Sequence, residues 1–207
     1  MTAETERIVQ PDLHALVAAR FKQSTTVPEK FFKAEAERIA QACWAIARRF
    51  HQGGRLLAFG NGACATDAQH VSVEFVHPVI VGKRALPALA LTNDSATLTG
   101  LMAGPETGKS FARQLKILAR PRDIALGFSL SGNCMNVAIA LQVARKMGLL
   151  TLGLTGNDGG VLKREDLDFC FVVPSHDPLV IQENHETLYH ILWELVHIFF
   201  ENEGLLQ

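Results

Sequence analysis

Five short apolar runs, separated by stretches of helical length, are the feature that most limits how this chain can fold. Amphipathic stretches at about 63–77, 94–120 and 134–147 separate most of the runs, and the second of these is long enough for two helices. Strands that are apolar on both faces and joined by helices form parallel sheets covered on both sides. We therefore predict an α/β domain, an αβα sandwich around a five-stranded parallel sheet, with strands at 55–59, 87–91, 123–128, 149–154 and 168–173.

Long helices are expected at both ends of this sandwich. A polar break (QSTT) precedes Pro28, and a proline is tolerated in the first turn of a helix. The pattern predicts an N-terminal helical segment over 1–27 and a single domain over 28–207, which begins with a helix ending at Gly53 and Gly54.

The last predicted helix, at about 179–202, is apolar over much of its surface. It carries a wide apolar stripe, and Trp193 and Phe200 lie on the flanks of that stripe. Packing on the chain's own sheet would explain the stripe but not the flanks. We therefore expect a second subunit to cover this helix.

Composition excludes several classes of protein. The chain has 207 residues, which suits one domain, and its net charge of −1 gives no electrostatic reason to expect a nucleic acid or an anionic membrane as partner. No apolar run reaches the roughly 20 residues of a membrane-spanning helix, and the N-terminus lacks the apolar core of a signal peptide. The four cysteines are scattered and form no CxxC pair, which favours a reducing, cytoplasmic location.

Two of the predicted strands end in small-residue turns that lead into helices. The first turn is GNGAC at 60–64, and the second is SLSGN at 129–133. Small residues let several backbone N–H groups face one point, and a helix N-terminus adds partial positive charge, so each turn is a candidate anion site. The alternative is that glycine and serine only allow a tight turn. Neither turn has the GxGxxG or P-loop pattern, so no nucleotide is predicted.

Proton or metal chemistry is indicated by His70 and Glu74, which share one face of the predicted helix after the first turn. An ordinary surface contact is the alternative. Gln182 and His190 lie eight residues apart, about 12 Å along a helix axis. They can converge on one ion or serve sites shared between subunits, and the sequence leaves both possibilities open. The segment IQENHETLYH supplies the candidates Gln182, Glu183, His185, Glu186 and His190.

The order of six motifs carries a family resemblance. The motifs are GNG…DAQHxxxEF, LTxD, FARQ, SxSGNxxN, LTGxDGG and IQExHxxxxH. From about residue 28 to 200 the chain resembles the SIS (sugar isomerase) family, and within it the phosphoheptose isomerases, which convert sedoheptulose 7-phosphate to D-glycero-D-manno-heptose 7-phosphate. The resemblance implies a flavodoxin-like fold, a homotetramer with active sites at subunit interfaces, and isomerisation through an enediol.

The resemblance also implies roles for individual residues. Glu74 corresponds to the general base and His190 to its acid partner. One zinc ion per subunit would be held by His70, Glu74, Gln182 and His190. The sugar-phosphate substrate would contact Asn61, Gly62, Cys64, Asp94, Ser129, Ser131, Asn133 and Gln182.

Departures from the family pattern gather on the substrate side. Three hydroxyl donors of the two turns are replaced, two of them by weakly donating thiols. The family's Gly-Arg after the glutamate helix is His77-Pro78 here, and the loop at 103–107 also differs. The pattern predicts the same reaction on a changed or weakly held substrate. The changed turn positions are Ala63, Cys64, Leu130 and Cys134.

Two alternative functions follow from these departures. One is an isomerase for a different sugar phosphate. The other is a non-catalytic phosphosugar-binding regulator or interaction protein, similar to the DnaA-initiator-associating relative, which lacks the catalytic glutamate and histidine. Glu74 and His190 are both present here, which favours the enzyme.

Overall fold

The computed structural model describes residues 12–105 and 107–206. Its five strands form one parallel sheet in the order β2-β1-β3-β4-β5. Every strand begins and ends within one residue of its predicted position, because a strand buried on both faces is recorded in the sequence as a continuous apolar run. The strands are β1 (Leu56–Gly60), β2 (Ala88–Ala90), β3 (Ile124–Ser129), β4 (Leu150–Thr155) and β5 (Phe169–Val172).

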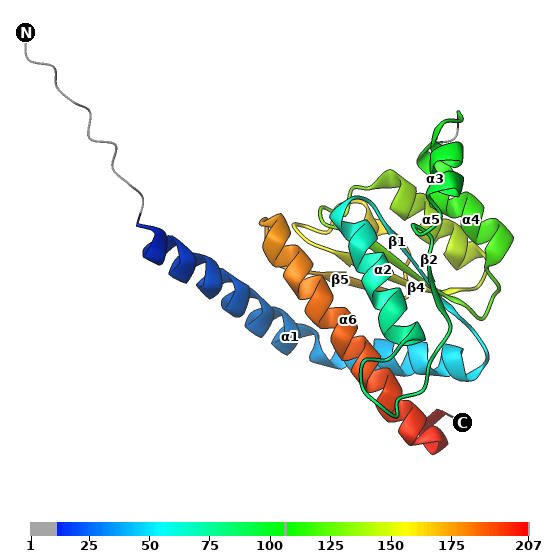
Figure 1. The fold of residues 1–207 in the computed structure, drawn as a ribbon, viewed down its shortest axis with the longest axis horizontal. Helices are drawn as coiled ribbons and strands as arrows, with labels where there is room; N and C mark the ends of the chain where they lie inside the picture. The colour runs from blue at the N-terminus through cyan, green and yellow to red at the C-terminus, as the bar shows by residue number, and fades with distance from the viewer. Residues whose placement is uncertain (1–11, 106, 207) are drawn as a thin grey trace, which may run out of the picture.

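Helices cover both faces of the sheet, as predicted (Figure 1). Alternate side chains of one strand enter two separate cores: Leu56 and Ala58 pack under one helical layer, whereas Leu57 and Phe59 pack under the other. The first layer contains α1 (Leu13–His51), α2 (Ala63–Val76) and α6 (Pro178–Glu201), and the second contains α4 (Ser110–Leu118) and α5 (Met135–Lys146). Shorter elements are α3 (Ser95–Met102), η1 (Thr107–Lys109), η2 (Leu162–Arg164) and η3 (Glu203–Leu206).

The predicted helix boundary at Pro28 is wrong, because α1 is one helix of 39 residues with Pro28 inside it. The hydroxyls of the QSTT segment are hydrogen-bonded within the helix: Ser24 Oγ donates to the carbonyl of Arg20 (3.3 Å) and Thr25 Oγ1 to that of Lys22 (3.0 Å). The polar residues therefore satisfy themselves without ending the helix. The first eleven residues of the predicted segment 1–27 lie outside the described residues, and its division from 28–207 stays a prediction.

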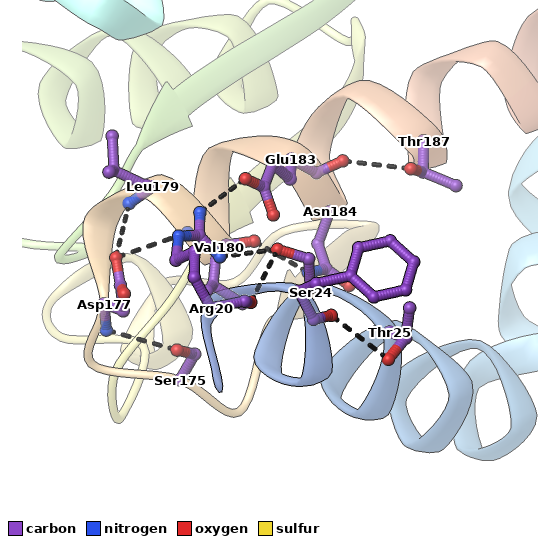
Figure 2. A network of polar contacts seen from close by, with 11 residues as sticks. Arg20, Ser24, Thr25, Ser175, Asp177, Leu179, Val180, Glu183, Asn184 and Thr187 are labelled. Carbon is purple, nitrogen blue, oxygen red and sulfur yellow. Dashed lines mark hydrogen bonds and ion pairs between the residues drawn. The ribbon is translucent and has the colours of Figure 1, made fainter. Parts of the chain in front are cut away.

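A contact with α6 anchors the early part of α1. Arg20 donates to Glu183 Oε1 at 2.5 Å and to Ser24 Oγ at 2.5 Å, as Figure 2 shows. Asp177 caps the start of α6 by accepting from the backbone N–H of Leu179 (2.9 Å). These contacts fix the first turns of α6, where Gln182 lies.

The structure accounts for part of the apolar surface of α6, and the expected cover by a second subunit stays a prediction, because Phe200 is only half-buried. The stripe packs against α1 and α2 of the same chain, and the flanking Trp193 is only 5% exposed because its indole lies against α2 and donates to the carbonyl of Glu74 (2.7 Å). Further exposed apolar side chains occur on the N-terminal half of α1, which extends away from the sandwich (Figure 1). They are Leu13, Leu16, Val17 and Phe21.

Across the described ranges 12–105 and 107–206, none of the helices combines the length and the apolar character that a membrane span requires.

Candidate active site

Both predicted turns lie where a ligand is expected in an open parallel sheet. From β1 the chain goes to β2 on one side, and β3 pairs on the other side, so the strand order reverses between β1 and β3. Ligands bind at the carboxyl ends of the strands beside such a reversal. The turn at 60–64 follows β1 and the turn at 129–133 follows β3, so the two turns are neighbours at this edge.

The first turn leads into α2 without a side-chain cap. Gly62 precedes α2 with φ 57° and ψ −123°. Cys64 is buried, and this burial raises the pKa of its thiol to about 12. The thiol therefore stays protonated and is a weak donor. The amide of Asn61 exchanges two hydrogen bonds of 2.9 Å with that of Asn136 at the start of α5, so this pair ties the first turn to the helix after the second.

The second turn carries two hydroxyl groups, that of the buried Ser129 and that of the half-buried Ser131. Ser129 Oγ accepts from the N–H of Cys134 (3.4 Å) and Ser131 Oγ accepts from that of Asn133 (3.3 Å), so the hydroxyl hydrogens are not used in these bonds. The side chain of Asn133 donates to the carbonyl of Ser131 and accepts from the N–H of Val161 (3.2 Å). Asn133 thus braces the turn against the segment after β4, and its predicted contact with substrate stays a prediction.

Asp94 has a structural role at the start of α3. Its carboxylate accepts from the backbone N–H of Thr97 (3.0 Å) and from its hydroxyl (2.6 Å). Both bonds lower the pKa of Asp94, and the bond from the hydroxyl of Thr97 has the larger effect. The predicted contact between Asp94 and substrate remains a prediction beside this capping role.

Helices α2 and α6 lie side by side and run in the same direction (Figure 1). Their contacts pair Ala63 with Gln182, His70 with Tyr189, and Glu74 with Trp193, and the two partners are 119 positions apart in each case. A constant separation means that the two helices advance together from the turn edge of the sheet. This pairing explains how residues so distant in sequence come to share one site.

The structure brings together three of the predicted residues. His70 Nε2 lies 3.3 Å from Glu74 Oε1, and the carboxylate of Glu74 is largely buried. The ring of His190 stands almost perpendicular to that of His70 (80°), with 5.2 Å between the ring centroids. A carboxylate and two imidazoles are thus within one cluster, a set of groups able to move protons or to hold a cation.

Two further residues complete this cluster. Tyr189 Oη lies 2.7 Å from His70 Nδ1, and Glu186 Oε1 lies 3.6 Å from the same nitrogen. The pKa of Tyr189 is raised, mainly because the side chain is buried, so its hydroxyl stays protonated. His70, Glu186 and His190 offer ligand atoms that all lie within 4.8 Å of one another. The spacing of four residues between Glu186 and His190 was a usable signal, whereas Tyr189 had none in the sequence.

Gln182 is bonded to residues at the start of α2. Its amide nitrogen donates to Asp67 Oδ1 (3.0 Å) and to the carbonyl of Ala63 (3.3 Å), beside the first turn. Asp67 is buried, and burial raises the pKa of its carboxyl to about 6, against the opposing effect of the bond from Gln182. Asp67 Oδ2 has no hydrogen-bond partner. Gln182 therefore belongs to the turn end of the α2–α6 pair.

His185 is a core residue and leaves the set of candidates. It is fully buried beside Phe128, and neither ring nitrogen has a hydrogen-bond partner. Burial lowers the pKa of its imidazole to about 4. The ring is neutral at ordinary pH and is not available to a ligand.

The donor set suits a zinc ion. Zinc prefers imidazole nitrogen and carboxylate oxygen in a four-coordinate arrangement. His70 and His190 supply the nitrogens, and Glu74 and Glu186 lie on either side of the His70 ring. Gln182 stays a predicted ligand, because only its amide nitrogen is bonded to Asp67.

Comparisons with known proteins identify the family of this chain. The SIS domain family matches residues 21–156. A phosphoheptose isomerase from Thermodesulfovibrio yellowstonii is 41% identical over 182 residues, which cover 87% of this chain and 90% of the relative. One from Aquifex aeolicus is 39% identical over 176 residues, which cover 85% of this chain and 92% of the relative.

Solved structures show the same similarity. The phosphoheptose isomerase of Francisella tularensis has a TM-score of 0.85 at 30% identity and covers 91% of this chain and 100% of its own. That of Neisseria gonorrhoeae has a TM-score of 0.82 at 33% identity and covers 89% and 98%. The sheet order, the paired turns and the His/Glu cluster thus occur in a chain that belongs to the SIS domain family and, within it, to the phosphoheptose isomerases.

Proposed function

We propose that this chain isomerises sedoheptulose 7-phosphate to D-glycero-D-manno-heptose 7-phosphate through an enediol. The observation that supports the proposal most is the contact between His70 and Glu74 at 3.3 Å, beside His190 and on the helix that starts at the first turn. Relatives at about 40% identity carry the name of this activity.

Glu74 would move the proton between the carbon atoms, and His190 would serve the two oxygens. Glu74 removes the proton from C1 of the ketose, and the resulting enediol is reprotonated at C2 to give the aldose. His190 donates a proton to the carbonyl oxygen at C2 as negative charge develops there, and it accepts the hydroxyl proton from O1 as the aldehyde forms. Glu74 is buried, which limits access of water to its carboxylate.

A cation would assist this chemistry. His70 and His190, with Glu74 or Glu186 as the carboxylate, would hold one zinc ion per subunit, and a bound zinc ion stabilises negative charge on the substrate oxygens. Gln182 was predicted as the fourth ligand, and its amide oxygen is not used in the bonds to Asp67 and Ala63.

The phosphate end of the substrate is assigned to the two turns. Gly62 and His70 are eight residues apart, so the first turn and the reactive cluster are separated by about 12 Å along α2. An extended seven-carbon sugar phosphate is long enough to lie along this path. The hydroxyls of Ser129 and Ser131 and the uncapped start of α2 would bind the phosphate.

An isomerase for a different sugar phosphate is the second candidate function. It is favoured by Cys64, whose buried thiol donates weakly, and by Leu130, whose side chain packs against the core instead of offering a donor. Both changes weaken the hold on the phosphate without touching Glu74.

We also propose that the protein is a homo-oligomer, in keeping with the tetramer that the resemblance implies, and that it works in the cytoplasm. The exposed stripe of Leu13, Leu16, Val17 and Phe21 on α1 is an apolar surface that a second copy would cover. Light scattering after size exclusion tests this, and replacement of Val17 and Phe21 by Asp should lower the measured mass. The scattered cysteines support the cytoplasmic location.

The function is tested by turnover of sedoheptulose 7-phosphate with and without zinc, in the wild-type chain and in Glu74→Gln and His190→Ala. We expect turnover in the wild type and its loss in both variants. Turnover that survives in Glu74→Gln would refute the assignment of the base. No turnover in a folded, zinc-loaded wild type, together with turnover of another sugar phosphate, would establish the second candidate function.

A further inference from the structure

The ring of His70 is held from both of its edges. Its Nε2 edge faces the carboxylate of Glu74 at 3.3 Å, and its Nδ1 edge contacts the hydroxyl of Tyr189 at 2.7 Å. The two rings pack edge to face, with 5.3 Å between their centroids. Tyr189 is only 1% exposed, so its position is set by the core between α6 and the sheet.

A hydroxyl group suits this place because it both donates and accepts. A neutral imidazole carries one proton, on either nitrogen. With the proton on Nε2 facing Glu74, the nitrogen Nδ1 accepts from Tyr189. With the proton on Nδ1, Tyr189 accepts it, and the lone pair of Nε2 is free for a cation. The ring therefore keeps its contact at Nδ1 in both tautomers.

We propose that Tyr189 is a positioning residue, whose hydroxyl holds His70 by Nδ1 so that Nε2 is the nitrogen presented to Glu74 and to a divalent cation. This inference rests on the proposed function, because it assumes that His70 serves a cation at the reactive cluster. Groups that orient a metal-binding histidine through its second nitrogen typically contribute 10- to 100-fold to metal affinity.

The chain offers a matched pair of variants. Tyr189→Phe removes only the hydroxyl and keeps the buried ring beside Phe128. Ser72→Ala also removes one buried hydroxyl, from α2 itself, but that hydroxyl donates to the carbonyl of Ala68 (2.7 Å) and does not touch the His70 ring. His70→Gln identifies the binding that depends on His70.

The measurement is the dissociation constant of Zn²⁺ for the full chain, by competition with a chromophoric chelator, with the visible spectrum of bound Co²⁺ as a second readout. We expect one Zn²⁺ per chain, lost in His70→Gln, about 10- to 100-fold weaker in Tyr189→Phe, and within about threefold of wild type in Ser72→Ala. The Co²⁺ spectrum should change in Tyr189→Phe alone of the two hydroxyl variants.

Each other result overturns the proposal. Zn²⁺ affinity in Tyr189→Phe within threefold of wild type would show that the hydroxyl does not position the ring. An equal loss of Zn²⁺ affinity in Ser72→Ala would show that the loss comes from general loosening of α2 and not from the contact with His70. No Zn²⁺ binding by the wild type, or Zn²⁺ binding that survives in His70→Gln, would show that His70 does not bind the cation. Turnover of sedoheptulose 7-phosphate by the wild type is scored separately, so failure of the positioning role and failure of the isomerase function are distinguishable.

Discussion

The buried imidazole of His185 should make the stability of this protein depend on pH. Folding lowers the pKa of His185 from 6.5 to about 4, because the ring is buried, and an interaction with the backbone of Thr155 opposes this only in part. Between these two values the unfolded chain binds a proton that the native chain does not. Stability is therefore complete above pH 6.5 and falls as the pH drops toward 4, by roughly 3 kcal/mol in all.

His185→Leu isolates this contribution. Leucine fills a similar space beside Phe128 and removes two polar atoms that lack partners, so we expect the variant to be at least as stable as wild type at pH 7. The difference in unfolding free energy, variant minus wild type, should then widen by roughly 2 to 3 kcal/mol between pH 7 and pH 4.5. Taking the difference cancels the titration of groups that both proteins share.

The assay is urea unfolding followed by circular dichroism, at one fixed protein concentration because oligomers gain stability with concentration. The exposed His14, replaced by Gln, controls for loss of a titratable ring. A difference that stays constant with pH, or that shrinks toward pH 4.5, would refute the reasoning, since either result requires a ring that is solvated or hydrogen-bonded in the native protein.

Three further predictions follow from the turns and their neighbours. Cys64→Ser should tighten sugar-phosphate binding, measured by calorimetry, because a hydroxyl donates better than the buried thiol; unchanged or weaker binding would contradict this. Asp67→Asn keeps an oxygen for Gln182 but removes a buried charge with a raised pKa, so the variant should be more stable than wild type above pH 6 in thermal melts, and this advantage should vanish toward pH 4. Gly132→Ala should lower the melting temperature by several degrees, because a Cβ at φ +72° would lie 2.0 Å from the carbonyl oxygen of Gly159; a wild-type melting temperature would show that the turn can shift.

The sheet could be predicted from the sequence because its signals are local. A strand buried on both faces is a continuous apolar run, and small residues mark the turns at its end. The same reasoning failed at Pro28, where local hydrogen bonds and the contact of Arg20 with Glu183 keep α1 continuous. At α6 it did not separate the two kinds of cover: Trp193 is buried by α2 of the same chain, whereas the cover of Phe200 by a second subunit stays a prediction.

Some residues of the candidate site could be predicted from local patterns or from the family resemblance, and others could not. His70 and Glu74 were found by a spacing of four residues on one helix, and His190 was assigned its role through the family resemblance. Tyr189 and Asp67 were missed, because their contacts with His70 and Gln182 depend on how α2 and α6 pair across more than a hundred residues. A register between distant helices is set by tertiary packing, and no local pattern records it.

The most direct test of the central claim is incubation of the wild-type protein with sedoheptulose 7-phosphate in D₂O, followed by proton NMR. A base that exchanges its proton with solvent should deliver deuterium to C2 of the aldose product, and Glu74→Gln should give neither product nor exchange. The account predicts a heptose 7-phosphate labelled at C2. A wild-type protein that binds the ketose but neither exchanges its C1 protons nor forms the aldose would contradict the assignment of this chain as an isomerase of that substrate.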